Sequence, residues 1–169
     1  MLTKEIFKKS EFLLNQFREK GFMIATAESC TGGLITAALT EIAGSSDVVD
    51  RGYVTYTNAA KSEMLGVDAD MIMQHGAVSP EVAQSMAIGA LDASNAQITI
   101  AVTGVAGPGQ SESKPSGLVY FGCVNINHHC IIEKMNFTGD RHMVRQKTVL
   151  HALDLAARMA ESMSSISGK

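Results

Sequence analysis

The sequence contains no tryptophan, and aromatic residues make up only 5% of its 169 positions. Proteins that bind single-stranded nucleic acid stack bases on aromatic side chains and present a basic surface to the phosphates. This chain instead has a formal net charge of -3 and an isoelectric point near 5.9. The composition therefore argues against a nucleic-acid partner.

Cysteine is also scarce, and the chain has only Cys30, Cys123 and Cys130. An odd number argues against a disulfide framework and fits a reducing compartment. No cysteine and histidine spacing is typical of zinc, so we expect neither a metal nor a cofactor. The apolar runs are too short to cross a membrane, and the N-terminus alternates charges where a secretory signal would be apolar. We therefore expect a cytoplasmic protein without membrane association.

With 46% hydrophobic residues, the chain is long enough to bury the core of a single domain, expected to span 1–169. Hydrophobic periodicity and turn residues predict helices and strands that alternate along the chain. The predicted strands are 22–27, 52–57, 97–102, 117–126 and 130–137. The predicted helices are 4–20, 33–42, 58–66, 68–75, 80–93 and one that follows Asp140. The expected fold class is α/β, a single layered α/β/α domain with a mixed sheet of about five or six strands.

The segment Ala27–Gly33 closes the first predicted strand and begins a helix. Its Ser29 hydroxyl lies where unpaired backbone N–H groups and the positive end of a helix dipole converge. Such a place suits a bound anion, or a nucleophile whose reaction creates an oxyanion. The same pattern also suits a plain helix N-cap followed by glycines that allow close packing. The segment alone leaves both interpretations open.

Two further turns, 56–58 and 103–109, follow predicted strands in the same way. In open α/β sheets, ligand sites form where such turns gather beyond the strand ends. The glycines of 103–109 allow backbone amides to form an anion-binding nest, and Thr103 adds a hydroxyl. No Gly-Lys-Ser/Thr follows, which argues against a nucleoside-triphosphatase. A surface loop without function is the alternative interpretation.

Lys61 is the best placed proton acceptor for a Ser29 nucleophile, because His75 is the only histidine near these turns. Its pKa would have to fall from about 10.4 toward neutrality, at a cost of about 4 kcal/mol. Burial and a neighbouring cation, Arg141 or Arg145, are expected to lower it. A solvated lysine on a helix surface is the alternative.

Two neighbours of Ser29 also have competing interpretations. Cys30 is intrinsically the better nucleophile, but we interpret it as a small buried hydrophobic residue behind the turn. Glu28 is interpreted as a partner of the helix dipole, and orientation of Lys61 is its alternative role.

Four ordered segments, 27–33, 53–61, 75–79 and 103–109, together resemble the CinA C-terminal-domain family, and the resemblance extends over about residues 5–162. The characterised activity of that family is hydrolysis of nicotinamide mononucleotide to nicotinic acid mononucleotide and ammonia. The resemblance therefore implies a nicotinamide-nucleotide amidohydrolase of pyridine nucleotide recycling. It also implies the stand-alone form, without the N-terminal pyrophosphatase-like domain of longer relatives or the activity of that domain.

By this resemblance Ser29 is the nucleophile and Lys61 its base, with Tyr56 and Thr103 in the catalytic neighbourhood. The implied substrate-binding residues are Cys30, Thr31, Gly32, Asn58, Gly104, Ala106, Gly107, Lys114, Arg141 and Arg145. The expected partner is a small-molecule nucleotide, and a homodimer is left open. The chain departs from the family at 110–113, where Gln-Ser-Glu-Ser replaces a more glycine-rich stretch.

Two functions of other classes stay open at this stage. The chain could be a non-catalytic module that binds a mononucleotide, or a partner protein in a competence or DNA-damage pathway. A binding module predicts saturable binding without release of ammonia, and a partner protein predicts neither binding nor release.

Overall fold

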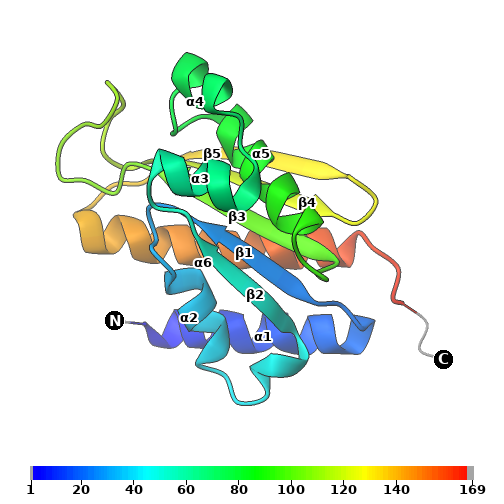
Figure 1. Cartoon of the computed structure of the whole chain (residues 1–169). Helices are drawn as coiled ribbons and strands as arrows, with labels where there is room; N and C mark the ends of the chain where they lie inside the picture. Colours follow the sequence, from blue (N-terminus) through cyan, green and yellow to red (C-terminus); the bar gives the residue numbers. More distant parts are fainter. Residues whose placement is uncertain (1, 167–169) are drawn as a thin grey trace.

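A five-stranded mixed sheet forms the centre of the fold, in the order β2-β1-β3-β4-β5 (Figure 1). The computed structural model describes residues 2–166, so the two ends of the predicted domain 1–169 lie outside the described residues. β1 pairs in parallel with β2 and β3, and β4 runs antiparallel to β3 and β5. The strands are β1 (Ile24–Glu28), β2 (Val49–Val54), β3 (Ile98–Gly104), β4 (Leu118–Asn125) and β5 (Cys130–Asn136).

Helices cover both faces of this sheet, as Figure 1 shows. One face carries α1 (Lys4–Lys20), α2 (Leu34–Thr40) and α6 (Arg141–Glu161). The other face carries α3 (Asn58–Leu65), α4 (Ala69–His75) and α5 (Pro80–Asp92), and a short 3-10 helix, η1, spans Ser45–Asp47. Each face has its own hydrophobic cluster, and the central strand β3 contributes side chains to both. The predicted layered α/β fold with a mixed sheet is confirmed.

Capping side chains begin the helices at the positions that the sequence predicts. Ser79 Oγ accepts a hydrogen bond from the Val82 amide at the start of α5, with Pro80 at the first helical position. Asp140 Oδ1 accepts one from the Met143 amide at 2.8 Å and begins α6. The first turns of α5 and α6 lie at the end of the sheet where β1 and β3 end (Figure 1).

The second strand differs from its prediction over 52–57. β2 begins at Val49 and ends at Val54, where it pairs with the end of β1. The prediction was wrong because β2 is an edge strand, and edge strands tolerate charged residues. Charged residues such as Asp50 make the first half of β2 less apolar than a buried strand would be. At the other end, Thr57 leaves the sheet, and its hydroxyl accepts a 3.1 Å hydrogen bond from the Ala60 amide to cap α3. Within the described residues, no helix has the length and apolar character needed to span a bilayer.

Candidate active site

Ser29 and Lys61 meet in the interior of the protein, beyond the ends of β1 and β2. Lys61 Nζ lies 3.1 Å from Ser29 Oγ and donates a 2.9 Å hydrogen bond to the carbonyl oxygen of Thr55. The side chains are enclosed, since Lys61 is only 1% exposed and Ser29 is 8% exposed. The cap at Thr57 starts α3 one turn before Lys61 and so turns this lysine toward the sheet. The predicted proximity of the two residues is therefore observed.

Burial lowers the pKa of Lys61 below its usual value of 10.5, because an ammonium group loses its hydration in the interior. The negative charges of Cys30, when ionised, and of Glu112 oppose this effect and favour the ammonium form. The neighbouring arginine that the sequence analysis expected to help is therefore not the cause. Desolvation alone gives Lys61 the direction of shift that a general base needs.

Cys30 is the residue next to Ser29, and its surroundings disfavour the ionised form of its thiol. Its side chain is buried, and burial raises the pKa of the thiol to about 12. A thiol with such a pKa stays protonated near neutral pH, whereas the thiolate is the nucleophilic form. The interpretation of Cys30 as a buried hydrophobic residue agrees with this environment.

Glu28 closes the N-terminus of α2 from within the protein. Its buried carboxylate accepts hydrogen bonds of 2.8–3.1 Å from the amides of Gly33, Ile35 and Thr36, and the Thr36 hydroxyl donates another. The helix-dipole interpretation of Glu28 is correct, but orientation of Lys61 falls instead to the Thr55 carbonyl. Glu28 engages these three amides, so they are not available to a substrate oxyanion.

A cavity of about 200 Å³ opens over Ser29 and Lys61. Nine of the residues nominated from the sequence lie on its wall: Ser29, Cys30, Tyr56, Asn58, Lys61, Thr103, Gly104, Ala106 and Arg141. The segments that follow β1, β2 and β3 contribute to this wall, as the rule for sites beyond strand ends predicts, together with the segment before α5 and the first turns of α3 and α6. The residues of the wall come from five separate parts of the chain, so the tertiary fold assembles the cavity.

Arg141 joins two of these loops at the rim of the cavity. One guanidinium nitrogen donates a 2.7 Å hydrogen bond to the carbonyl of Gly107, and the other donates a 3.1 Å bond to the Tyr56 hydroxyl. Thr103 has a different position, because its buried hydroxyl donates a 2.7 Å hydrogen bond to the Ala77 carbonyl. Thr103 thus ties the end of β3 to the segment before α5 while lining the cavity.

The other nominated residues lie outside the cavity wall. Arg145 donates a 2.7 Å hydrogen bond to the carbonyl of Thr31, next to Gly32, and so supports the Ser29 turn from behind. Lys114 donates to the carbonyls of His75, at 3.0 Å, and Val78. The substrate-binding roles of Thr31, Gly32, Gly107, Lys114 and Arg145 stay predictions. Within residues 2–166, no group of three or more His, Cys, Asp or Glu side chains could hold a metal ion.

Comparison with known proteins assigns the family. Residues 7–160 match the model of the CinA C-terminal domain. The chain belongs to the CinA C-terminal domain family. It is 44% identical over 159 residues to the nicotinamide-nucleotide amidohydrolase PncC of Enterobacter agglomerans, which covers 94% of this chain and 97% of that protein. The namesake protein of Escherichia coli K12 is 43% identical over 154 residues, or 90% of this chain and 93% of that protein.

The comparisons also include longer relatives and crystal structures of about the same length as this chain. A CinA-like protein of Citrifermentans bemidjiense is 49% identical over 142 residues, which are 83% of this chain but 34% of that protein. The competence/damage inducible protein CihA from Agrobacterium tumefaciens superposes with a TM-score of 0.91 at 45% identity, covering 94% of this chain and 98% of that one. The resemblance stated from the four sequence segments is therefore confirmed.

The sequence analysis missed four residues of the cavity wall: Ala77, Val78, Ser111 and Glu112. The first two belong to the CinA-like segment 75–79, whose residues the resemblance does not assign to the site. Glu112 belongs to the stretch 110–113 that departs from the family, so the resemblance assigned it no role. A charged residue within a long glycine-rich loop after a strand is the sequence signal that points to Glu112.

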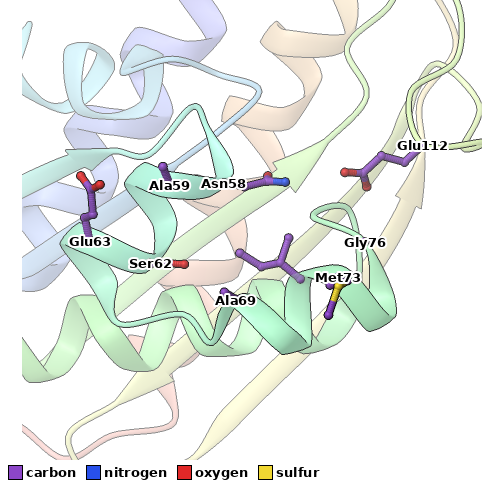
Figure 2. A pocket seen from close by; sticks show the side chains of 9 residues that line it. Asn58, Ala59, Ser62, Glu63, Ala69, Met73, Gly76 and Glu112 are labelled. Atoms are coloured by element: carbon purple, nitrogen blue, oxygen red, sulfur yellow. The ribbon is translucent and has the colours of Figure 1, made fainter.

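A second hollow of about 700 Å³ adjoins the cavity, and the two share Asn58 and Glu112. Figure 2 shows the Glu112 side chain directed from its loop toward Asn58 and Gly76, with Glu63 near the opposite end. Apolar side chains of α4, including Ile72 and Met73, form its floor. The cavity over Ser29 and Lys61 therefore continues into a wider surface hollow past Glu112.

Proposed function

We propose that this chain is a nicotinamide-nucleotide amidohydrolase that converts nicotinamide mononucleotide and water to nicotinic acid mononucleotide and ammonia. The observation that carries the proposal is the 3.1 Å contact between Lys61 Nζ and Ser29 Oγ in a buried cavity. Full-length similarity to relatives named nicotinamide-nucleotide amidohydrolase PncC supports the choice of substrate. A hydroxyl next to a desolvated amine pairs a nucleophile with a base, an arrangement that can transfer an acyl group from an amide.

In the first half of the reaction, Ser29 becomes acylated. The Thr55 carbonyl accepts an N–H of Lys61 and holds Nζ 3.1 Å from Ser29 Oγ, within reach of the hydroxyl proton once the amine is neutral. Lys61 takes the hydroxyl proton as Oγ attacks the carboxamide carbon, and the carbonyl electrons move to oxygen. When the C–N bond breaks, the Lys61 ammonium gives its proton to the leaving nitrogen. Ammonia departs, and an ester joins Ser29 to the substrate.

In the second half, water releases the product from the ester. The Lys61 amine, neutral again, takes a proton from the water as its oxygen attacks the ester carbon. The bond to Ser29 Oγ then breaks, and Lys61 returns the proton to that oxygen. The product leaves as nicotinic acid mononucleotide, and both residues regain their starting protonation states.

Arg141 is the residue that we assign to the substrate phosphate. A phosphate carries about -1.5 to -2 charges near neutral pH and pairs well with a guanidinium group. Of the lysines and arginines within residues 2–166, only Lys61 and Arg141 line the cavity, and Lys61 must be neutral to act as a base. The phosphate therefore points toward the rim while the carboxamide points toward Ser29.

The decisive experiment is incubation of the purified protein with nicotinamide mononucleotide, nicotinamide riboside and free nicotinamide, with measurement of ammonia. We expect ammonia from the mononucleotide, less from the riboside and least from free nicotinamide. Saturable binding of the mononucleotide without ammonia would support the non-catalytic binding module instead. Neither binding nor release would favour a partner protein in competence or DNA damage.

We also propose that residues 1–169 act as one catalytic domain in the cytoplasm, without a nucleic-acid or membrane partner. The acidic net charge and the three cysteines support this assignment. A homodimer stays a prediction, which light scattering of the purified protein tests. A nucleic-acid mobility-shift assay should show no complex at physiological salt.

A further inference from the structure

Glu112 places a carboxylate on the wall of the catalytic cavity, where the proposed mechanism gives it no role. Of the Asp, Glu, Lys and Arg residues that the structure describes, only Lys61, Glu112 and Arg141 line this cavity. When Lys61 is neutral, one anion and one cation remain. The cavity therefore suits a ligand that carries one positive and one negative group.

The position of Glu112 is held by a tight turn. Ser111 and Lys114 exchange backbone hydrogen bonds of 3.1 and 2.8 Å around it. Glu112 and Ser113 have φ angles of 51° and 62°, a left-handed conformation that is unfavourable for non-glycine residues. The Lys114 ammonium anchors this turn to the carbonyl of His75 at 3.0 Å. The surroundings thus impose a conformation that an unrestrained loop would avoid.

Gly76 makes room for the carboxylate. A Cβ atom built at this position would lie 2.8 Å from Glu112 Oε2, closer than real Cβ contacts. Gly76 also has a φ of 80°, where a side chain would be strained. Lys114 Nζ lies equally close to that Cβ position, so the carboxylate and the ammonium that anchors its turn share the space beside Gly76. The Glu112 side chain is directed toward Asn58 across the opening (Figure 2).

The charge of Glu112 acts on groups in the catalytic cavity. It favours the protonated form of Lys61, against the larger effect of burial. A positive group bound between Glu112 and Lys61 would experience the same attraction.

A nicotinamide nucleotide carries the two charges that this cavity complements. Its ring nitrogen is bonded to ribose and is a pyridinium cation, whereas the phosphate is an anion. We propose that Glu112 determines specificity for the oxidised ring, by stabilising the pyridinium while the phosphate meets Arg141 and the carboxamide meets Ser29. The reduced dihydropyridine ring is uncharged and gains nothing from the carboxylate. This inference rests on the proposed function.

The test compares binding of the oxidised and the reduced mononucleotide by calorimetry. The protein carries Ser29→Ala, so that neither ligand is consumed, with or without Glu112→Gln. We expect Glu112→Gln to weaken binding of nicotinamide mononucleotide about fivefold and to change binding of its reduced form less than about twofold. Glu112→Asp keeps the charge and should keep the preference, which separates charge from a folding defect.

The matched control is Glu63→Gln, because Glu63 lines only the neighbouring hollow. It should leave both dissociation constants unchanged. Equal weakening of both ligands by Glu112→Gln, or no weakening of either, would overturn the inference. Failure of the proposed function is distinguished by a separate result: the unmodified protein would release no ammonia when incubated with nicotinamide mononucleotide.

Discussion

Lys61 Nζ donates a 2.9 Å hydrogen bond to the carbonyl oxygen of Thr55, the residue that follows β2. The Thr55 amide in turn donates a 2.8 Å hydrogen bond to the carbonyl of Glu28, the last residue of β1. Ser29 follows Glu28 in the chain, so the proposed nucleophile extends from the end of β1 and the proposed base, on α3, is hydrogen-bonded to the end of β2. Their geometry depends on the sheet rather than on a surface loop.

Replacement of the proposed nucleophile should abolish catalysis but spare binding. We expect Ser29→Ala to lower ammonia release from nicotinamide mononucleotide by about a thousandfold or more, because the ester intermediate needs the hydroxyl oxygen. Calorimetry should show that the mononucleotide still binds. Cys30→Ala is the matched control and should be far milder, since the Cys30 thiol stays protonated. An inactive Cys30→Ala beside an active Ser29→Ala would reverse the assignment.

The pH dependence of turnover should report the protonation of Lys61. Burial lowers the pKa of this amine, and only the neutral form accepts a proton. Therefore kcat/KM should rise with pH through the lowered pKa and become level above it. Lys61→Arg should be nearly inactive from about pH 6 to 10, because guanidinium does not release its proton in this range. Turnover of Lys61→Arg near that of the unmodified protein would contradict the role of base.

Phosphate recognition should depend on Arg141. Arg141→Ala should lower kcat/KM for nicotinamide mononucleotide about tenfold or more and barely change the weak rate with nicotinamide riboside, which lacks the phosphate. Arg145→Ala is the informative comparison, because Arg145 contacts the Thr31 carbonyl outside the cavity wall. Arg145→Ala should change kcat/KM for the mononucleotide and for the riboside by the same factor. Similar efficiency of the unmodified protein with riboside and mononucleotide would show that no phosphate site exists.

Removal of the buried carboxylate at the start of α2 should destabilise the fold. Glu28→Gln places an amide nitrogen against backbone donors, so we expect the free energy of unfolding to fall by about 1–3 kcal/mol. Urea unfolding followed by circular dichroism measures this change. Glu41→Gln alters an exposed carboxylate at the other end of the same helix and should have little effect. Equal stability of Glu28→Gln and the unmodified protein would contradict the capping role.

The sequence by itself determined the elements whose signals are local. Ser79 and Asp140 begin helices because a capping side chain needs only the amides of the next turn. The continuous apolar run that forms β3 marks a central strand because both of its faces must be buried. The four motif segments likewise indicated the family and the chemical roles of Ser29 and Lys61, since each residue type carries its chemistry with it.

Only the tertiary structure decided which of these groups meet. Arg141 and Arg145 are one helical turn apart and lie on the same face of α6, yet only Arg141 lines the cavity, because the Gly107 and Tyr56 loops meet the first turn of the helix and the Thr31 turn meets the second. The edge position of β2 also depends on a partner distant along the chain, since β2 pairs with β1 and no strand pairs with its other side in the part of the chain that the structure describes. Glu112 reaches the cavity because its anchored turn lies opposite Gly76, a neighbour that no local pattern could reveal.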